Sequence, residues 1–222
     1  NFCSIGLHEG RTVISRSQKS IIEEARKLTA LSDFKGYILD VGGSTANMYG
    51  IECPKKLTHG PCKNKRCLYP RVCTGLIPDH SRQINLLTSL RKIKGVKKVF
   101  VASGIRYNLL LQDKKHCAVY TQELVNHHTS GQLKVAPEHI TQKILKLMGK
   151  PQSRSLLNFK QIFEKAVKSS RQKQFLTYYF IAAHPGCTEE DMRELKSFTV
   201  KELKLTPRQV QIFTPLPSTY SS

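Results

Sequence analysis

The feature that most constrains the fold of this chain is a repeated alternation of short apolar segments with amphipathic ones. The apolar segments have the length and flanking residues of buried strands. Five segments are predicted as strands, at residues 36–41, 97–102, 132–136, 175–183 and 209–213. Amphipathic segments lie between them, and repeats of this kind predict parallel strands joined by crossover helices. No G-x-G-x-x-G follows the first strand, so the prediction is an α/β fold, an open or partial β/α barrel.

Several helices are predicted from their apolar spacing and their end signals. Ser17 is placed to cap a helix that runs to Leu28. Thr188 and Asp191 have the spacing of a capping box, with further negative charge in the first turn. The remaining predicted helices cover residues 81–93, 140–148 and 159–167. Cys117 falls within another predicted helix, as a small buried apolar residue.

A cysteine-rich segment at residues 46–78 breaks this alternation. Its four cysteines have the spacing C-x8-C-x4-C-x5-C and are Cys53, Cys62, Cys67 and Cys73. Thiols this close together favour a metal site over free or transient thiols, and the spacing leaves zinc and iron–sulfur both open. The segment is predicted to be an insertion at the C-terminal edge of the strand at 36–41, where active-site loops of β/α barrels gather.

Charge and cysteine usage limit the class of protein. The formal net charge is +20, which favours a polyanionic partner such as nucleic acid, or else reflects well-solvated basic faces. The seven cysteines are too few, and odd in number, for a disulfide scaffold. No apolar run approaches the roughly 18 residues of a membrane span, and no signal peptide is visible. We expect a cytoplasmic protein with reduced thiols and no membrane partner, with the caution that the chain begins at Asn1 without Met.

Three further stretches place chemically useful groups at predicted strand ends. Gly42-Gly43 follows the first strand and allows close backbone approach to a ligand, or simply a tight turn. Lys134 and Glu138 lie within and at the end of the third strand, where Glu138 serves either a ligand or the following helix N-terminus. His184-Pro185-Gly186 follows the fourth strand, and turn and cap chemistry explains it without a catalytic role.

Cys3 stands in the setting Phe2-Cys3-Ser4-Ile5 and is followed by His8-Glu9-Gly10-Arg11. This setting is similar to the end of a C-x3-C-x2-C cluster motif cut before its third cysteine. Together with matching stretches through nearly the whole chain, it resembles the YgiQ-type (UPF0313-like) radical S-adenosylmethionine (SAM) proteins. The matching stretches are residues 15–18, 40–47, 57–60, 96–100, 103–106, 130–139, 148–151, 184–186 and 209–211. The chain departs from the group's pattern at Ser44 and Ser218, where Pro and Gly are favoured.

The resemblance implies that residues 1–222 are a radical SAM core, truncated at the N-terminus and also at the C-terminus. Such a core uses a [4Fe–4S] cluster to cleave SAM and generate a 5′-deoxyadenosyl radical, and needs an electron donor such as flavodoxin or ferredoxin. Cys3 is then the third cluster ligand, in a fragment that lacks the other two. The Cys53–Cys73 loop would carry a second metal, zinc or iron–sulfur.

The resemblance also assigns roles around SAM, without naming the substrate. By this resemblance the strand at 36–41 is the second strand of the barrel, and the cysteine-rich insertion follows it. Gly42 and Gly43, after that strand, would meet the SAM amino group through backbone. Glu138 and Lys134 would lie near the SAM ribose or carboxylate, and the His184-Pro185-Gly186 loop would flank the adenine. The alternative function is a zinc-containing nucleic-acid-binding protein without catalysis, motivated by the charge and the cysteine-rich segment.

Overall fold

All five predicted strands are present in the computed structural model, which describes residues 2–43, 45–63, 65–207 and 209–222. They are β1 (Tyr37–Ile38), β2 (Lys98–Val99), β3 (Gln132–Glu138), β4 (Phe175–Ala182) and β5 (Gln211–Ile212). β1 pairs with β2, while β3, β4 and β5 form a second sheet, and every pairing is parallel. The predicted parallel α/β arrangement is therefore confirmed. Ser44, where the resembling family favours Pro, lies outside the described residues.

Backbone contacts link the two sheets in chain order. Ile105 forms a parallel bridge with Val135, and Val101 N–H donates to the His128 carbonyl at 2.9 Å. The strand order thus follows the chain from β1 to β5, as in a β/α barrel and unlike a doubly wound sheet. Over the residues that the structure describes, β1 and β5 do not pair with each other, so the barrel is not closed.

The helices occupy the predicted segments between the strands. The five predicted from their spacing correspond to α2 (Gln18–Thr29), α4 (Ser81–Arg91), α7 (Gln142–Met148), α8 (Arg154–Ser169) and α9 (Glu189–Lys201). Ser17 Oγ accepts from Ser20 N–H, and Thr188 and Asp191 form the full capping box, so both predicted caps are confirmed. The shorter elements are α1 (Ile5–His8), η1 (Ala46–Met48), α3 (Pro54–His59), α5 (Tyr107–Leu110), α6 (Cys117–Glu123) and the π-helix η2 (Leu124–His128).

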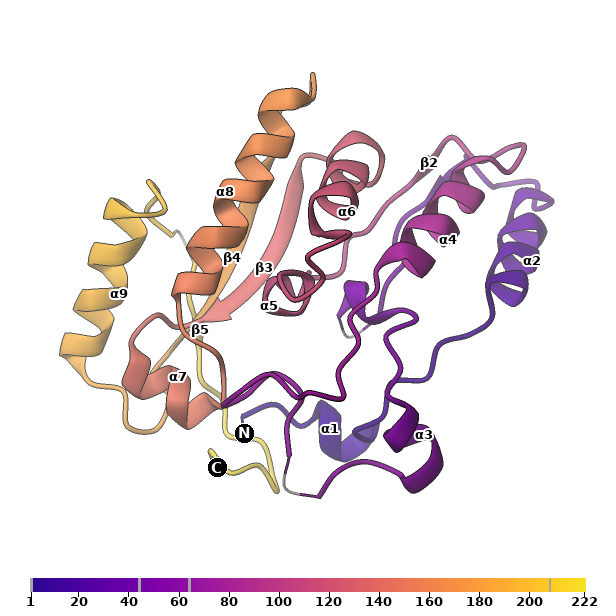
Figure 1. Cartoon of the computed structure of the whole chain (residues 1–222). Coiled ribbons are helices and arrows are strands. Elements are labelled where there is room, and N and C mark those ends of the chain that lie inside the picture. Colours follow the sequence, from indigo (N-terminus) through magenta and orange to yellow (C-terminus); the bar gives the residue numbers. More distant parts are fainter. Residues whose placement is uncertain (1, 44, 64, 208) are drawn as a thin grey trace.

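One face of the strands packs against helices to make the main core. Leu133 and Val135 of β3 and Phe180 of β4 are buried in the same cluster as Phe159 and Phe163 of α8. In Figure 1 the helices α9, α8, α6, α4 and α2 follow one another in a row from left to right along the strands. Cys117 is buried at the start of α6, as predicted.

The opposite face of the strands carries exposed aromatic and aliphatic side chains. Phe175 and Tyr179 of β4 are 61% and 49% exposed, and Leu39, just after β1, is 72% exposed. Their strand neighbours, such as Ile38 and Phe180, face the core instead, as the two-residue period of a strand requires. Parallel sheets usually have both faces covered, so this apolar face marks the side on which further structure is expected.

The loops that follow the strands gather at one edge. Figure 1 shows α1, α3, α7 and both chain ends at the lower edge, the side toward which the β3 arrow points. The segment at residues 46–78, which contains η1 and α3, leaves β1 on this side. Within the described part of the chain, no helix has both the length and the apolar character to cross a membrane.

Candidate active site

The predicted site residues follow the C-terminal ends of three parallel strands. Glu138 is the last residue of β3, His184 follows β4, and Gly42 and Gly43 follow β1. Parallel strands end at a common edge, and in α/β folds ligands bind at that edge.

Glu138 is a buried carboxylate in a strained backbone conformation. Its φ angle is +67°, a left-handed value that non-glycine residues rarely adopt, and the residue is 7% exposed. Oε1 accepts from Lys150 Nζ at 3.0 Å, whereas Oε2 is buried without a hydrogen-bond partner among the described residues. Burial raises the pKa of this carboxyl, and the Lys150 ammonium opposes the rise. Glu138 therefore offers one unpaired acceptor to a ligand hydroxyl or ammonium.

The Glu138 side chain does not cap the helix that follows it, α7. The residue at the N-terminus of α7 is Thr141, and no side chain caps that helix. Glu138 instead pairs with Lys150, which lies just beyond the other end of α7 and also donates to the Ala136 carbonyl at 2.7 Å. The carboxylate thus joins the end of β3 to the end of α7.

The N-terminal segment lies beside this pair. Lys150 Nζ is 5.8 Å from the centroid of the Phe2 ring, within the range of a cation–π contact. Burial lowers the pKa of Lys150, and the Glu138 carboxylate opposes that fall. Cys3 directly follows Phe2 in the chain, so the contact between Phe2 and Lys150 also places Cys3 near this pair. Cys3 itself is exposed and forms no disulfide. The fold thereby brings Cys3 to the same edge as Glu138.

His184 is held in a fixed orientation under the N-terminal segment. Its Nδ1–H donates to the Pro185 carbonyl at 2.9 Å, so Nε2 is the acceptor of the Ser221 hydroxyl at 2.9 Å. The ring also contacts Phe2 and Phe213 edge-on, with centroids 6.4 Å and 5.0 Å away. Burial lowers the pKa of His184, which keeps the ring neutral. Both nitrogens are therefore occupied within the protein.

Gly186 completes this loop in a conformation that favours glycine. Its φ angle is +83°, and a Cβ at this position would lie 2.8 Å from Leu147 Cδ1 of α7. The loop after β4 therefore packs against α7, next to Lys150.

The two adjacent glycines after β1 face different surroundings. A Cβ on Gly42 would lie 2.7 Å from Ser103 Oγ and 2.8 Å from Ser103 Cβ, so glycine is required by packing. A Cβ on Gly43 would meet nothing within 4 Å. Asp40 fixes the neighbouring loop by accepting from Ala102 N–H at 2.8 Å and from the Ser103 hydroxyl. Gly42 thus satisfies the tight-turn interpretation, while Gly43 leaves its backbone open to a ligand.

A buried network fixes the loop that continues from Gly43. Asn47 Oδ1 accepts from Arg106 N–H at 2.7 Å, and Asn47 Nδ2 donates to His80 Nε2 at 3.2 Å. His80 then carries its proton on Nδ1, which donates to Asp113 at 2.9 Å. Burial lowers the pKa of His80. The loops after β1 and β2 are therefore held together by a neutral histidine.

Lys134 lies apart from the Glu138–Lys150 pair. It is an exposed residue of β3 opposite Thr177, on the face of the sheet that helices do not cover. Four residues of strand, about 13 Å at 3.3 Å per residue, separate it from Glu138. The structure brings together Cys3, Glu138, His184 and Gly186, and leaves Lys134 at a distance along the strand.

The four cysteines of the cysteine-rich segment are spread along it. All are free and partly exposed, and Cys73 N–H donates to the Cys67 carbonyl at 2.8 Å. Among the described residues, the one group of three metal-type ligand atoms within 4.8 Å of each other is Asp79, Asp113 and His116. His116 already pairs with both carboxylates, its Nδ1 lying 3.1 Å from Asp113 Oδ1 and 3.3 Å from Asp79 Oδ1.

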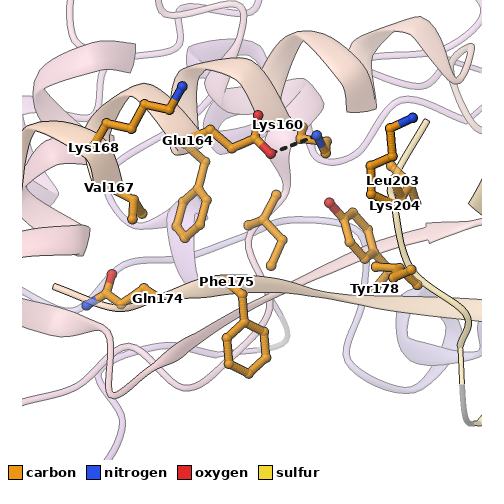
Figure 2. A pocket seen from close by; sticks show the side chains of 12 residues that line it. Lys160, Glu164, Val167, Lys168, Gln174, Phe175, Tyr178, Leu203 and Lys204 are labelled. Carbon is orange, nitrogen blue, oxygen red and sulfur yellow. Dashed lines mark ion pairs between the residues drawn. The ribbon is translucent and has the colours of Figure 1, made fainter. Parts of the chain in front are cut away.

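One cavity lies away from the strand ends that carry these residues. It has a volume of about 560 Å³ and is bounded by α8, by β4 and by residues 203–205. Figure 2 shows Lys160 and Glu164 of α8 paired above it, while the Phe175 ring points away from α8, toward the uncovered face. Phe175 begins β4, so the cavity starts at the strand's N-terminal end and contains none of the predicted site residues.

Sequence reasoning missed two residues of this edge. Lys150 falls in the stretch 148–151, which the family resemblance includes without giving Lys150 a role. His80 had no signal at all, because its importance comes from Asn47 and Asp113, each 33 positions away. A buried polar residue of this kind is recognisable only from its partners.

Several known proteins are similar to this chain over its whole length. No family model matches the chain. It is 53% identical over 222 residues to a UPF0313 protein of Fusobacterium nucleatum, matching all of this chain and 39% of that protein. It is 46% identical over 222 residues to a UPF0313 protein of Clostridium perfringens, covering 33% of it. A UPF0313 protein of Methanocella arvoryzae is 46% identical over 221 residues, and 36% of it is covered. The chain thus spans between one third and two fifths of the length of these relatives.

Proposed function

We propose that this chain, which is homologous over its whole length to UPF0313 proteins, is part of a radical SAM enzyme. The observation that carries the proposal is the contact of Phe2, the residue before Cys3, with Lys150 of the Glu138–Lys150 pair, at the C-terminal edge of a parallel α/β sheet. An exposed thiol there is available to iron, and an unpaired carboxylate oxygen close by is available to a polar ligand.

The residues at this edge offer several contacts to SAM but only one thiolate, Cys3, to an iron–sulfur cluster. Glu138 Oε2 would accept from the ribose hydroxyls or the ammonium of SAM, and the open backbone at Gly43 would meet its amino group. The His184 loop would flank the adenine. Cys3 would supply one of three cluster thiolates, and the proposal requires the other two from residues that precede Asn1.

A [4Fe–4S] cluster with bound SAM supplies one-electron cleavage of SAM to a 5′-deoxyadenosyl radical. The share of this chain is to bind and orient. Lys150 holds Glu138 in place, Asp40 and Ser103 hold the glycine loop, and Ser221 holds His184. We assign no proton transfer to His184, because both of its nitrogens are occupied.

We also propose a more specific fold than the parallel α/β arrangement described above. A partial β/α barrel of the radical SAM type explains the chain order of the strands and the helices along one face. The exposed Phe175, Tyr179 and Leu39 would then face the barrel interior. We further propose a cytoplasmic enzyme with flavodoxin or ferredoxin as electron donor, and a second metal in the Cys53–Cys73 loop.

The test is to express the gene at its full natural length without oxygen and to reconstitute it with iron and sulfide. A brown protein that forms 5′-deoxyadenosine from SAM under dithionite is expected, and a Cys3→Ala variant should lose both colour and product. A colourless protein that binds zinc and leaves SAM intact would reject the proposal in favour of the non-catalytic zinc protein. Absence of a C-x3-C motif shortly before Asn1 would reject it from sequence alone.

A further inference from the structure

A basic pocket in the cysteine-rich segment is the strongest feature outside the candidate active site. The stretch from Cys53 to Cys73 contains six lysines and arginines and no aspartate or glutamate. They are Lys55, Lys56, Lys63, Lys65, Arg66 and Arg71. The segment is therefore positive in its own right, beyond its share of the overall charge.

The pocket has a volume of about 460 Å³. Its lining includes Lys65, Arg66 and Arg71, together with Tyr69 and Thr74. Cations, one aromatic ring and a hydroxyl around a space of this size are the groups that contact a nucleotide unit, through its phosphate and its base.

Two of the cations are available to a ligand. Lys65 and Arg71 are exposed, and neither is paired with a carboxylate in the part of the chain that the structure describes. Uncompensated cations on a partly exposed surface attract phosphate strongly.

The other residues fix the pocket against α7. The Tyr69 hydroxyl is 3.5 Å from the Lys146 carbonyl, and the ring is only partly exposed. The Arg66 guanidinium lies over Gly149, where a Cβ would come within 1.5 Å of its Nη1. Gly149 precedes Lys150, the partner of Glu138, so the pocket adjoins the candidate active site across the end of α7.

We propose that this pocket binds single-stranded nucleic acid, with phosphates on Lys65 and Arg71 and a base against Tyr69. An unpaired strand suits it, because an aromatic ring and scattered cations recognise stacked bases and backbone. A nucleic-acid strand held in this pocket lies next to the candidate active site, where SAM is proposed to bind. The substrate class of the enzyme is then nucleic acid, an assignment that rests on the proposed function.

The test measures anisotropy of fluorescein-labelled oligo(U) of about 12 nucleotides with the full natural-length protein, prepared without cluster or SAM. Lys65→Gln/Arg71→Gln is expected to weaken binding at least about tenfold and to reduce the salt slope by about 1.4, for two lost phosphate contacts. The matched control is Arg171→Gln/Lys173→Gln. It removes the same two residue types from exposed positions just before β4, at the opposite end of the strands, and should change affinity less than about twofold.

Tyr69 provides an independent arm. Tyr69→Ala should weaken binding about tenfold, within the range for one stacked base, while Tyr69→Phe keeps the ring and the affinity.

Melting temperatures of all variants must match the wild type. Three results would overturn the inference: equal loss in the two charge pairs, competition by UMP as strong as by the oligomer, or tighter binding of a duplex. SAM cleavage with no oligo(U) binding would refute this inference alone, whereas binding without SAM cleavage would refute only the enzyme.

Discussion

Lys150 donates a 3.0 Å hydrogen bond to Glu138, across the length of α7, and also contacts the ring of Phe2, the residue before Cys3. The pair joins the end of β3 to the residue that follows the left-handed Gly149 cap. Its Glu138 Oε2 has no partner among the described residues. An ion pair whose carboxylate keeps one unpaired oxygen is suited to bind a ligand, because Lys150 already positions that carboxylate before the ligand binds.

The first prediction concerns the strength of this pair. Lys150→Met should destabilise the fold by about 2 kcal/mol at neutral pH, below the 3–5 typical of fully buried pairs, because the Lys150 side chain is 26% exposed. Loss of the ammonium raises the pKa of Glu138 further. The deficit should therefore shrink as pH falls and Glu138 becomes protonated in the folded state.

Urea denaturation from about pH 4 to pH 7.5 measures this dependence. Lys196→Met, an exposed lysine of α9, is the control and should change stability by less than about 0.5 kcal/mol. A deficit that does not vary with pH would show that Lys150 acts through packing alone.

The second prediction separates the adjacent glycines. Gly42→Ala should destabilise the fold by about 1–3 kcal/mol, because its Cβ would press on Ser103, which Asp40 holds in place. Gly43→Ala should leave stability within about 0.5 kcal/mol, since its Cβ would meet no atom within 4 Å. If Gly43 meets SAM, that second variant should bind SAM about tenfold more weakly, a change of ~1.4 kcal/mol.

Denaturation midpoints and equilibrium dialysis with SAM provide the two measurements. Equal destabilisation by both alanines would contradict the structure around Gly42. Unchanged SAM binding in a stable Gly43→Ala variant would remove Gly43 from the proposed site.

The third prediction is a pH dependence of stability from His80. Burial lowers its pKa in the folded state, so the unfolded chain binds the proton more readily. Stability should therefore fall as pH drops below about 6.5, the ordinary histidine pKa. His80→Gln removes this proton from the balance, and the slope of unfolding free energy should decrease by up to about 1.4 kcal/mol per pH unit.

Denaturation between about pH 5 and pH 7.5 tests this, with His8→Gln at an exposed position as the control. The His80 variant should also be less stable at neutral pH by about 1–3 kcal/mol, because Asp113 and Asn47 lose a partner. A slope identical to wild type would mean that His80 does not titrate on unfolding.

The fourth prediction tests the second metal. A Cys62→Ala/Cys67→Ala variant of the full-length protein should lose its zinc, or the iron beyond that of one [4Fe–4S] cluster, when metal content is measured by mass spectrometry. Cys187→Ala, outside the segment, is the control. Unchanged metal content in the double variant would show that these thiols bind nothing.

Local signals in the sequence were sufficient for much of the fold. The five strands, the helices that separate them and the caps at Ser17 and Thr188 depend on neighbouring residues, through periodicity and hydrogen bonds within one turn. The predicted strands at 36–41, 97–102 and 209–213 are longer than β1, β2 and β5. Backbone hydrogen bonds nevertheless continue past the named strands, with Val41 N–H donating to the Phe100 carbonyl and Phe213 N–H to the Ala182 carbonyl, both at 2.8 Å. The parallel arrangement followed from the order of the elements.

The sequence by itself therefore determined the strand–helix order, the burial of Cys117 and the basic character of the cysteine-rich segment. Only the tertiary structure decided that the segment with Phe2 and Cys3 lies against Lys150, that His80 holds Asn47, and that Gly42 and Gly43 differ. The physical reason is the range of the interactions. Periodicity and caps act between near neighbours, whereas a buried hydrogen bond or a steric contact joins residues that only packing brings together.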